Sequence, residues 1–170
     1  MRPMTEPGVM VYQFNGLRLI TQYNAAQACL AEGNNLETAY AVNTLLTAYA
    51  ALEALVSESA ACMYPKLYAD RTGFRLIALI RQYECFLATD GRSGERIPDE
   101  ISEISSHRIA LTHSEPDSER SRNVGAVLSA SDAERFCQAV VKVALWLWNE
   151  RRPMPASLEF ERSNLILVAK

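Results

Sequence analysis

Both histidines of the chain fall in one stretch, residues 105–116 (SSHRIALTHSEP), together with an arginine. His113 titrates near neutral pH, so it can take up or supply a proton. Arg108 carries a lasting positive charge on a planar group whose donors match the oxygens of a phosphate. These two residue types, with four residues between them, predict chemistry at a phosphate group.

The whole chain limits where such chemistry could take place. Its 170 residues are enough for one domain, 1–170, and 49% of them are hydrophobic. Seven glycines and seven prolines are few, which favours long helices with short connections. The net charge of −3 argues against binding nucleic acid by bulk charge, although a local basic patch would still be compatible with it.

The four cysteines, Cys29, Cys62, Cys85 and Cys137, show no spacing typical of a zinc site. We therefore predict buried, reduced thiols in a cytoplasmic protein, with no metal and no cofactor. The sequence has no charged-then-apolar leader and no apolar run of about 18 residues, so no membrane segment is predicted.

Helical spacing of apolar residues predicts the first three elements. A helix is expected over about 16–31, where Leu19, Tyr23, Ala26 and Leu30 keep that spacing. A long second helix is expected over about 36–63, and a third over about 69–88.

A fourth helix begins near Asp99 and must end before Pro116. The fifth is predicted to start at a capping box, Ser131 with Glu134, and to reach about residue 150. Together these elements predict an all-α bundle of four to five helices over about 16–150. An extended tail follows over 154–170, and residues 9–14 could pair with 165–169 as a small strand pair.

The fifth helix is apolar on nearly every face over 136–148. Such a helix is usually buried on two sides, which makes a homodimer plausible.

The geometry of a helix limits how Arg108 and His113 could act together. Positions five apart on a straight helix differ by about 140°, so Arg108 and His113 would point apart. Either the last turn before Pro116 unwinds, or the two side chains act across a two-fold axis.

The motif Arg108-Ile-Ala-Leu-Thr-His113 resembles the R-x(4–6)-H motif of the HEPN family (higher eukaryotes and prokaryotes nucleotide-binding domains). The long second helix with Glu53 in ALEAL is similar to the family's second helix, which often carries an acidic residue there. The resemblance covers about residues 16–150 and implies a HEPN-like helical bundle.

Active members of that family are metal-independent endoribonucleases that work as dimers, often as toxins or defence factors. The resemblance therefore implies Arg108 and His113 as catalytic residues in a dimer cleft. Glu53, His107 and Thr112 would support them. It also implies RNA as substrate and a separate antitoxin or partner protein. Ile109 stands where active members commonly have Asn or Asp, which favours an alternative: a non-catalytic module that binds RNA, a nucleotide or a protein.

Basic residues are unevenly placed along the chain. None lies between Arg18 and Lys66, whereas Lys66, Arg71 and Arg75 gather around the third predicted helix. They form either a solvated face or a strip that guides RNA toward the site.

Overall fold

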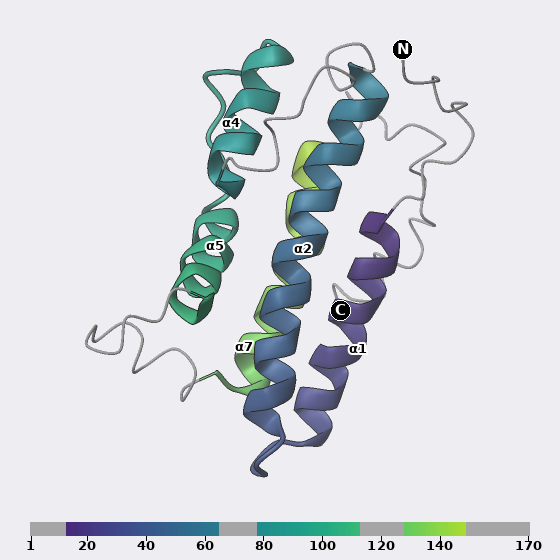
Figure 1. Ribbon diagram of the computed structural model, residues 1–170, viewed down its shortest axis with the longest axis vertical. Helices are drawn as coiled ribbons and strands as arrows, with labels where there is room; N and C mark the ends of the chain where they lie inside the picture. The colour runs from purple at the N-terminus through teal and green to yellow at the C-terminus, as the bar shows by residue number, and fades with distance from the viewer. Residues whose placement is uncertain (1–12, 65–77, 113–127, 149–170) are drawn as a thin grey trace, which may run out of the picture.

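The computed structural model describes residues 13–64, 78–112 and 128–148, and these fold into helices only. The helices are α1 (Gln13–Leu30), α2 (Glu37–Met63), α4 (Leu79–Thr89), α5 (Asp99–Thr112) and α7 (Ala130–Leu147) (Figure 1). The predicted all-α bundle is confirmed for these residues. Of the predicted strand pair, Gln13 and Phe14 belong to α1, and the remaining residues lie outside the described part.

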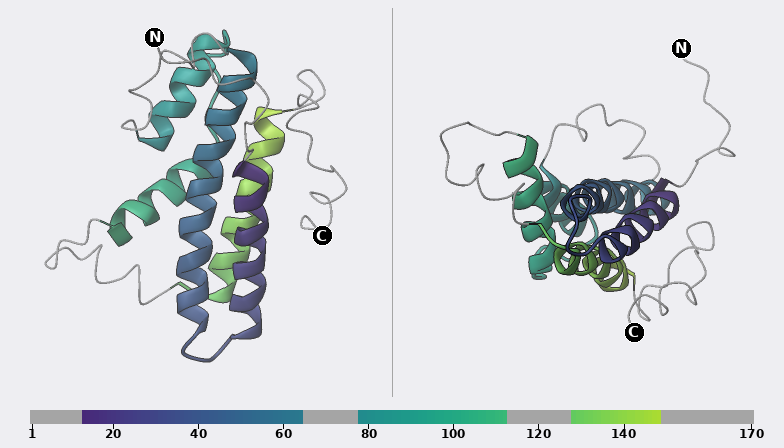
Figure 2. Two further views of the ribbon diagram at one scale, coloured as in Figure 1. Left: turned by 45° about the vertical axis from the view of Figure 1, so that its right-hand side comes forward. Right: turned by 90° about the horizontal axis from the view of Figure 1, so that it is seen from below.

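The long helix α2 lies at the centre of the bundle (Figures 1 and 2). On one side α1 and α7 pack against it and against each other, and on the other side α4 and α5 pack against it. Helix α7 also touches α5, so α2 and α7 separate α1 from α5. The largest fully buried side chains include Phe14, Leu45, Leu52, Tyr83, Phe86 and Phe136.

By length and composition, α2 is the one described helix apolar enough to cross a membrane, and half of its most apolar window is buried inside the bundle. Its buried residues include the predicted apolar positions Leu45, Tyr49, Leu52 and Val56. Its apolar character is therefore accounted for by its place in the core.

Two carboxylates of α2 hold the starts of neighbouring helices. The Glu58 carboxylate accepts the backbone N–H groups of Gln13 and Phe14, the first residues of α1. The Glu37 carboxylate accepts the N–H of Gly33 and, across the bundle, that of Ala130. Backbone donors at helix starts lack partners within the helix, so these contacts fix α1 and α7 to α2.

Helix α7 begins earlier than predicted. Its capping box is formed by Ser129 and Asp132, with the Ser129 hydroxyl accepting the Asp132 N–H. The predicted box at Ser131 and Glu134 is wrong, because both side chains lie inside the helix and are exposed. Two boxes with the same spacing overlap here, and the observed one lets the helix begin at Ala130, whose N–H is accepted by Glu37.

The prediction for the cysteines is wrong at two positions. Cys137 is buried, as expected, but Cys29 on α1 and Cys85 on α4 are exposed, and none of the four forms a disulfide. Burial raises the pKa of the Cys137 thiol to about 11, so that thiol stays neutral and packs as a small apolar group.

Candidate phosphate-binding site

Arg108 lies in the last turns of α5 and faces α2. Its guanidinium carbon is 4.9 Å from the centre of the Tyr49 ring, which is a cation–π contact. Tyr49 itself is nearly buried on α2, so the ring is a fixed platform under the charge. The neighbours Ile101 and Ile104 are fully buried and hold α5 in place. Arg108 is half-buried on the apolar stripe of α5, and the Tyr49 ring is the aromatic neighbour of its charge.

Glu53 stands one helical turn after Tyr49 and completes the group. A hydrogen bond links the Tyr49 hydroxyl to the Glu53 carboxylate. Burial is the main influence on this carboxylate and raises its pKa, while the Tyr49 hydrogen bond and the charge of Arg108 act in the opposite direction. Glu53 is therefore electrostatically coupled to Arg108, and Tyr49 touches both.

Among the described residues, no carboxylate forms an ion pair with Arg108, whereas three other arginines are paired. Arg92 is bound by Glu95, Arg96 by Asp99 at 2.8 Å, and Arg135 by Glu103 and Asp132 at 2.9 Å each. The Arg108 side chain makes no hydrogen bond to any described residue. The described residues therefore leave the donors of Arg108 unoccupied, and phosphate is the kind of anion that such a planar group suits.

The other predicted supporting residues lie apart from this group. The Nε2 atom of His107 is 3.8 Å from a Glu103 oxygen, and its ring meets the edge of Phe136 on α7. His107 therefore points toward α7, whereas Arg108 points toward α2. The Thr112 hydroxyl is exposed and donates to the backbone carbonyl of Arg108 at 3.0 Å. The structure joins Arg108 to Glu53 but does not bring His107 to them.

Four predicted residues lie outside the described part: His113, Lys66, Arg71 and Arg75. Tyr49 was not predicted as a site residue, because its place on the apolar stripe of α2 marked it only as core. The signal that could have found it is its spacing, since a tyrosine four residues before a glutamate shares a helix face with it.

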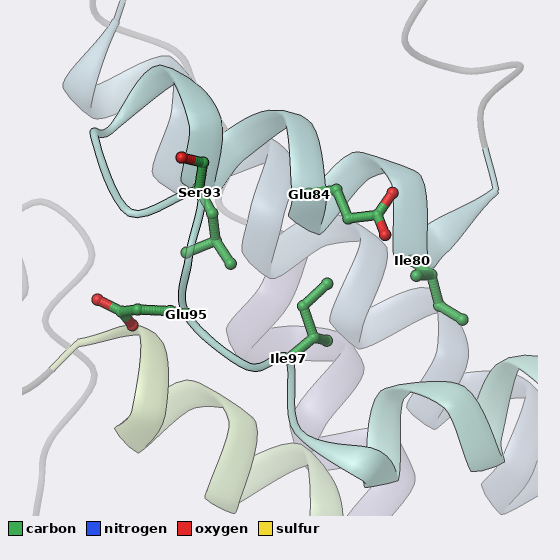
Figure 3. A pocket seen from close by; sticks show the side chains of 6 residues that line it. Ile80, Glu84, Ser93, Glu95 and Ile97 are labelled. Carbon is green, nitrogen blue, oxygen red and sulfur yellow. The ribbon is translucent and has the colours of Figure 1, made fainter.

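A cavity of about 320 Å³ lies elsewhere, between α4 and the connection that leads to α5 (Figure 3). Three aliphatic side chains line it with Ser93, Glu84 and Glu95. Its two carboxylates would repel a phosphate, and Arg108 is not among its lining residues. Among the described residues, no group of three or more His, Cys, Asp or Glu side chains could hold a metal ion.

No family model, curated protein or solved structure matches this chain.

Proposed function

We propose that Arg108, Tyr49 and Glu53 form the phosphate-binding part of a metal-independent endoribonuclease site in a HEPN-like helical protein. The observation that carries the proposal is the surroundings of the Arg108 guanidinium. Its guanidinium is held over an aromatic ring and beside a coupled carboxylate, and among the described residues no carboxylate occupies its donors. An arginine kept in this state is suited to bind an anion.

The proposed reaction starts with the RNA 2′-hydroxyl. It loses its proton to a base and attacks the neighbouring phosphorus, while the bond to the 5′-oxygen of the next nucleotide breaks. The products are a 2′,3′-cyclic phosphate and a free 5′-hydroxyl. Arg108 stabilises the charge on the phosphate oxygens, and His113 transfers the proton. DNA lacks the 2′-hydroxyl and is not cleaved.

Tyr49 and Glu53 are positioning residues in this scheme. The ring restricts the guanidinium to one side, and the Glu53 carboxylate holds the Tyr49 hydroxyl. A rigid charge stabilises a transition state better than a mobile one, because it needs no rearrangement during the reaction. The exposed Ile109, next to Arg108, supports the second candidate: a non-catalytic module that uses the same arginine to bind RNA, a nucleotide or an acidic protein segment.

The test is cleavage of end-labelled structured and unstructured RNAs in EDTA. The parent is compared with Arg108→Ala, His113→Ala and, as a matched arginine control, Arg96→Ala. Arg96 is exposed and paired with Asp99. We expect cyclic phosphate ends from the parent and from Arg96→Ala, and loss of cleavage in the other two. If a folded parent cleaves none of the RNAs but binds them through Arg108, the non-catalytic module is correct.

A further inference from the structure

The cavity between α4 and the connection to α5 has three aliphatic walls. Ile80 and Leu87 come from α4, and Ile97 comes from the connection (Figure 3). Leu87 is fully buried, while Ile80 and Ile97 are half-buried. The volume of about 320 Å³ lies at the small end of the range of about 300–1,000 Å³ that is usual for ligand cavities. The cavity therefore suits a small molecule with an aliphatic part.

The two carboxylates at this cavity differ in their surroundings. Two nitrogens of the Arg92 guanidinium donate to the two Glu95 oxygens, and these hydrogen bonds lower the pKa of the Glu95 carboxyl. Arg92 also lies over the Trp146 ring, 5.2 Å from its centre, which fixes the pair on α7. In Figure 3 the Glu95 carboxylate extends to one side, and the Glu84 carboxylate extends toward Ile80 on the other. The charge of Glu95 is therefore already neutralised.

Glu84 is the carboxylate that keeps its charge at the cavity. It lies four residues after Ile80 and three before Leu87, so the three side chains share one face of α4. No described residue forms an ion pair with Glu84, and this includes the exposed Arg81 three residues earlier. The ion pairs among the described residues go to other carboxylates, namely Glu95, Asp99, Glu100, Glu103 and Asp132.

The charge and the walls of the cavity exclude several classes of ligand. A phosphate would meet the unpaired negative charge of Glu84. Ca²⁺ and Mg²⁺ take six or more oxygen ligands, and half of the lining residues are aliphatic. A neutral hydrocarbon would take water from the Glu84 carboxylate without giving it a partner. A cation carried on an aliphatic chain meets none of these objections.

We propose that this cavity binds a small primary aliphatic amine in its ammonium form. The ammonium pairs with the Glu84 carboxylate, and the carbon chain lies against the three aliphatic walls. A primary amine is protonated at pH 7, as lysine is, and its ammonium has three donors. One donor is accepted by Glu84, and the others stay in water because Glu84 is exposed.

This site is separate from the phosphate-binding site, because Arg108 is not among its lining residues. The proposal therefore does not depend on the proposed function. A lysine side chain has the same chemistry as an alkylammonium ion, so a lysine of the chain itself is a competing occupant. The chain has three lysines: Lys66, Lys142 and Lys170. Lys142 is paired with Glu100, and the other two lie outside the described residues.

The experiment is a methyl NMR titration of the full chain with n-pentylamine at pH 7, and with 1-pentanol as a neutral ligand of the same length. A single exposed ion pair and a short aliphatic chain predict weak binding, with a dissociation constant of about 0.1–1 mM. We expect saturable shifts of the Ile80, Leu87 and Ile97 methyl groups with pentylamine. Pentanol should bind about 10-fold more weakly, because it leaves Glu84 unpaired.

Glu84→Gln keeps the shape of the side chain and removes its charge. It should weaken pentylamine binding about 10-fold and leave pentanol binding unchanged. Glu32→Gln is the matched control, because Glu32 is an exposed glutamate after α1, away from the cavity. It should leave the binding of both ligands unchanged. Equal losses in the two variants would mean that the amine responds only to net charge, which overturns the proposal.

Two further arms separate the sources of the ammonium group. Carbodiimide coupling of the free protein, followed by peptide mass spectrometry, tests for a bond between Glu84 and a lysine of the same chain. We expect no such bond, and finding one overturns the proposal. Nα-acetyl-lysine methylamide should bind more weakly than pentylamine, because its backbone exceeds the small cavity. Equal or tighter binding would assign the cavity to a lysine of a protein partner. Absence of saturable shifts at the three walls also overturns the proposal.

Discussion

Two arginines on opposite sides of the α2–α7 pair have opposite surroundings. Arg18 of α1 is buried beside Cys137, and a strip of leucine, isoleucine and tyrosine faces outward from the same helix. Arg108 of α5 is half-buried over Tyr49, while Ile101 and Ile104 of the same helix face the core. Helix α5 buries Ile101 and Ile104, whereas α1 buries Phe14 but leaves four large apolar side chains exposed: Leu19, Ile20, Tyr23 and Leu30.

The two helices therefore expose different kinds of side chain: α5 exposes a charge and α1 exposes apolar residues. On α5, the guanidinium of Arg108 lies over Tyr49, and we propose that it binds a ligand. On α1, packing inside the bundle leaves Leu19, Ile20, Tyr23 and Leu30 exposed. Substitutions on the two helices should therefore have effects that differ in size and kind.

The largest effect is expected at Arg108. Replacing it with alanine should lower the rate of RNA cleavage by about 100- to 1,000-fold, the usual loss when one group that stabilises transition-state charge is removed. Initial cleavage rates in EDTA measure this. Arg18→Met should leave the rate unchanged, because Arg18 is buried in α1, away from the site. Equal losses in both variants would show that the distinction between the two arginines is wrong.

The next effect concerns stability. Burial lowers the pKa of Arg18, which means that the interior disfavours its charge. Replacing a buried charge by an apolar side chain of similar length often stabilises a protein, so Arg18→Met should raise the free energy of unfolding by about 1–3 kcal/mol. Urea denaturation at pH 7 measures the change. A loss of stability would mean that Arg18 holds the core together through its polar contacts.

A smaller effect should appear on adding salt. RNA binding through Arg108 releases counterions, so its affinity should fall as salt rises, and Arg108→Ala should reduce the logarithmic slope by about 0.7. Filter binding between about 50 and 200 mM salt measures the slope for the parent and the variant. An unchanged slope in Arg108→Ala would show that Arg108 does not contact the phosphates.

The smallest effect is a shift in titration. Burial raises the pKa of both Glu53 and Glu58, but Arg108 opposes the shift only at Glu53. In Arg108→Ala the pKa of Glu53 should rise further, while that of Glu58 stays unchanged. A carboxylate with a raised pKa stabilises the fold less once it ionises, so the variant should lose stability more steeply as pH rises above about 4. Carbon NMR of the glutamate side chains measures both groups.

The sequence was sufficient for the helices and insufficient for their orientation. The sequence predicted α2 within one residue at its start, from the capping pair Asn34 and Glu37, and at its observed end, Met63, because Pro65 follows. The spacing of apolar residues on α1 picked out Leu19, Tyr23, Ala26 and Leu30, but it could not say on which side they lie. Periodicity identifies an apolar face, and only packing decides whether that face is turned inward.

The candidate site was predictable in the same partial way. Arg108 and Glu53 were expected from residue type and position, and α5 and α2 bring them close enough to interact. Tyr49 was not expected, because an aromatic residue on a core stripe has no feature in the sequence that marks it as the support of an arginine. His107 resembled a site residue only through its neighbours in sequence. On a helix, adjacent residues point about 100° apart, and here they face different helices.

The hydrogen bonds of Glu37 have a consequence for synthesis on the ribosome. Helices α1 and α2 emerge early and can pair as a hairpin, yet α7, which packs against both, follows only after α4 and α5. At about 5–20 residues per second, the nascent chain waits several seconds for Ala130 to reach the Glu37 carboxylate. During that wait the groove that α7 will fill is open to chaperones and to neighbouring chains.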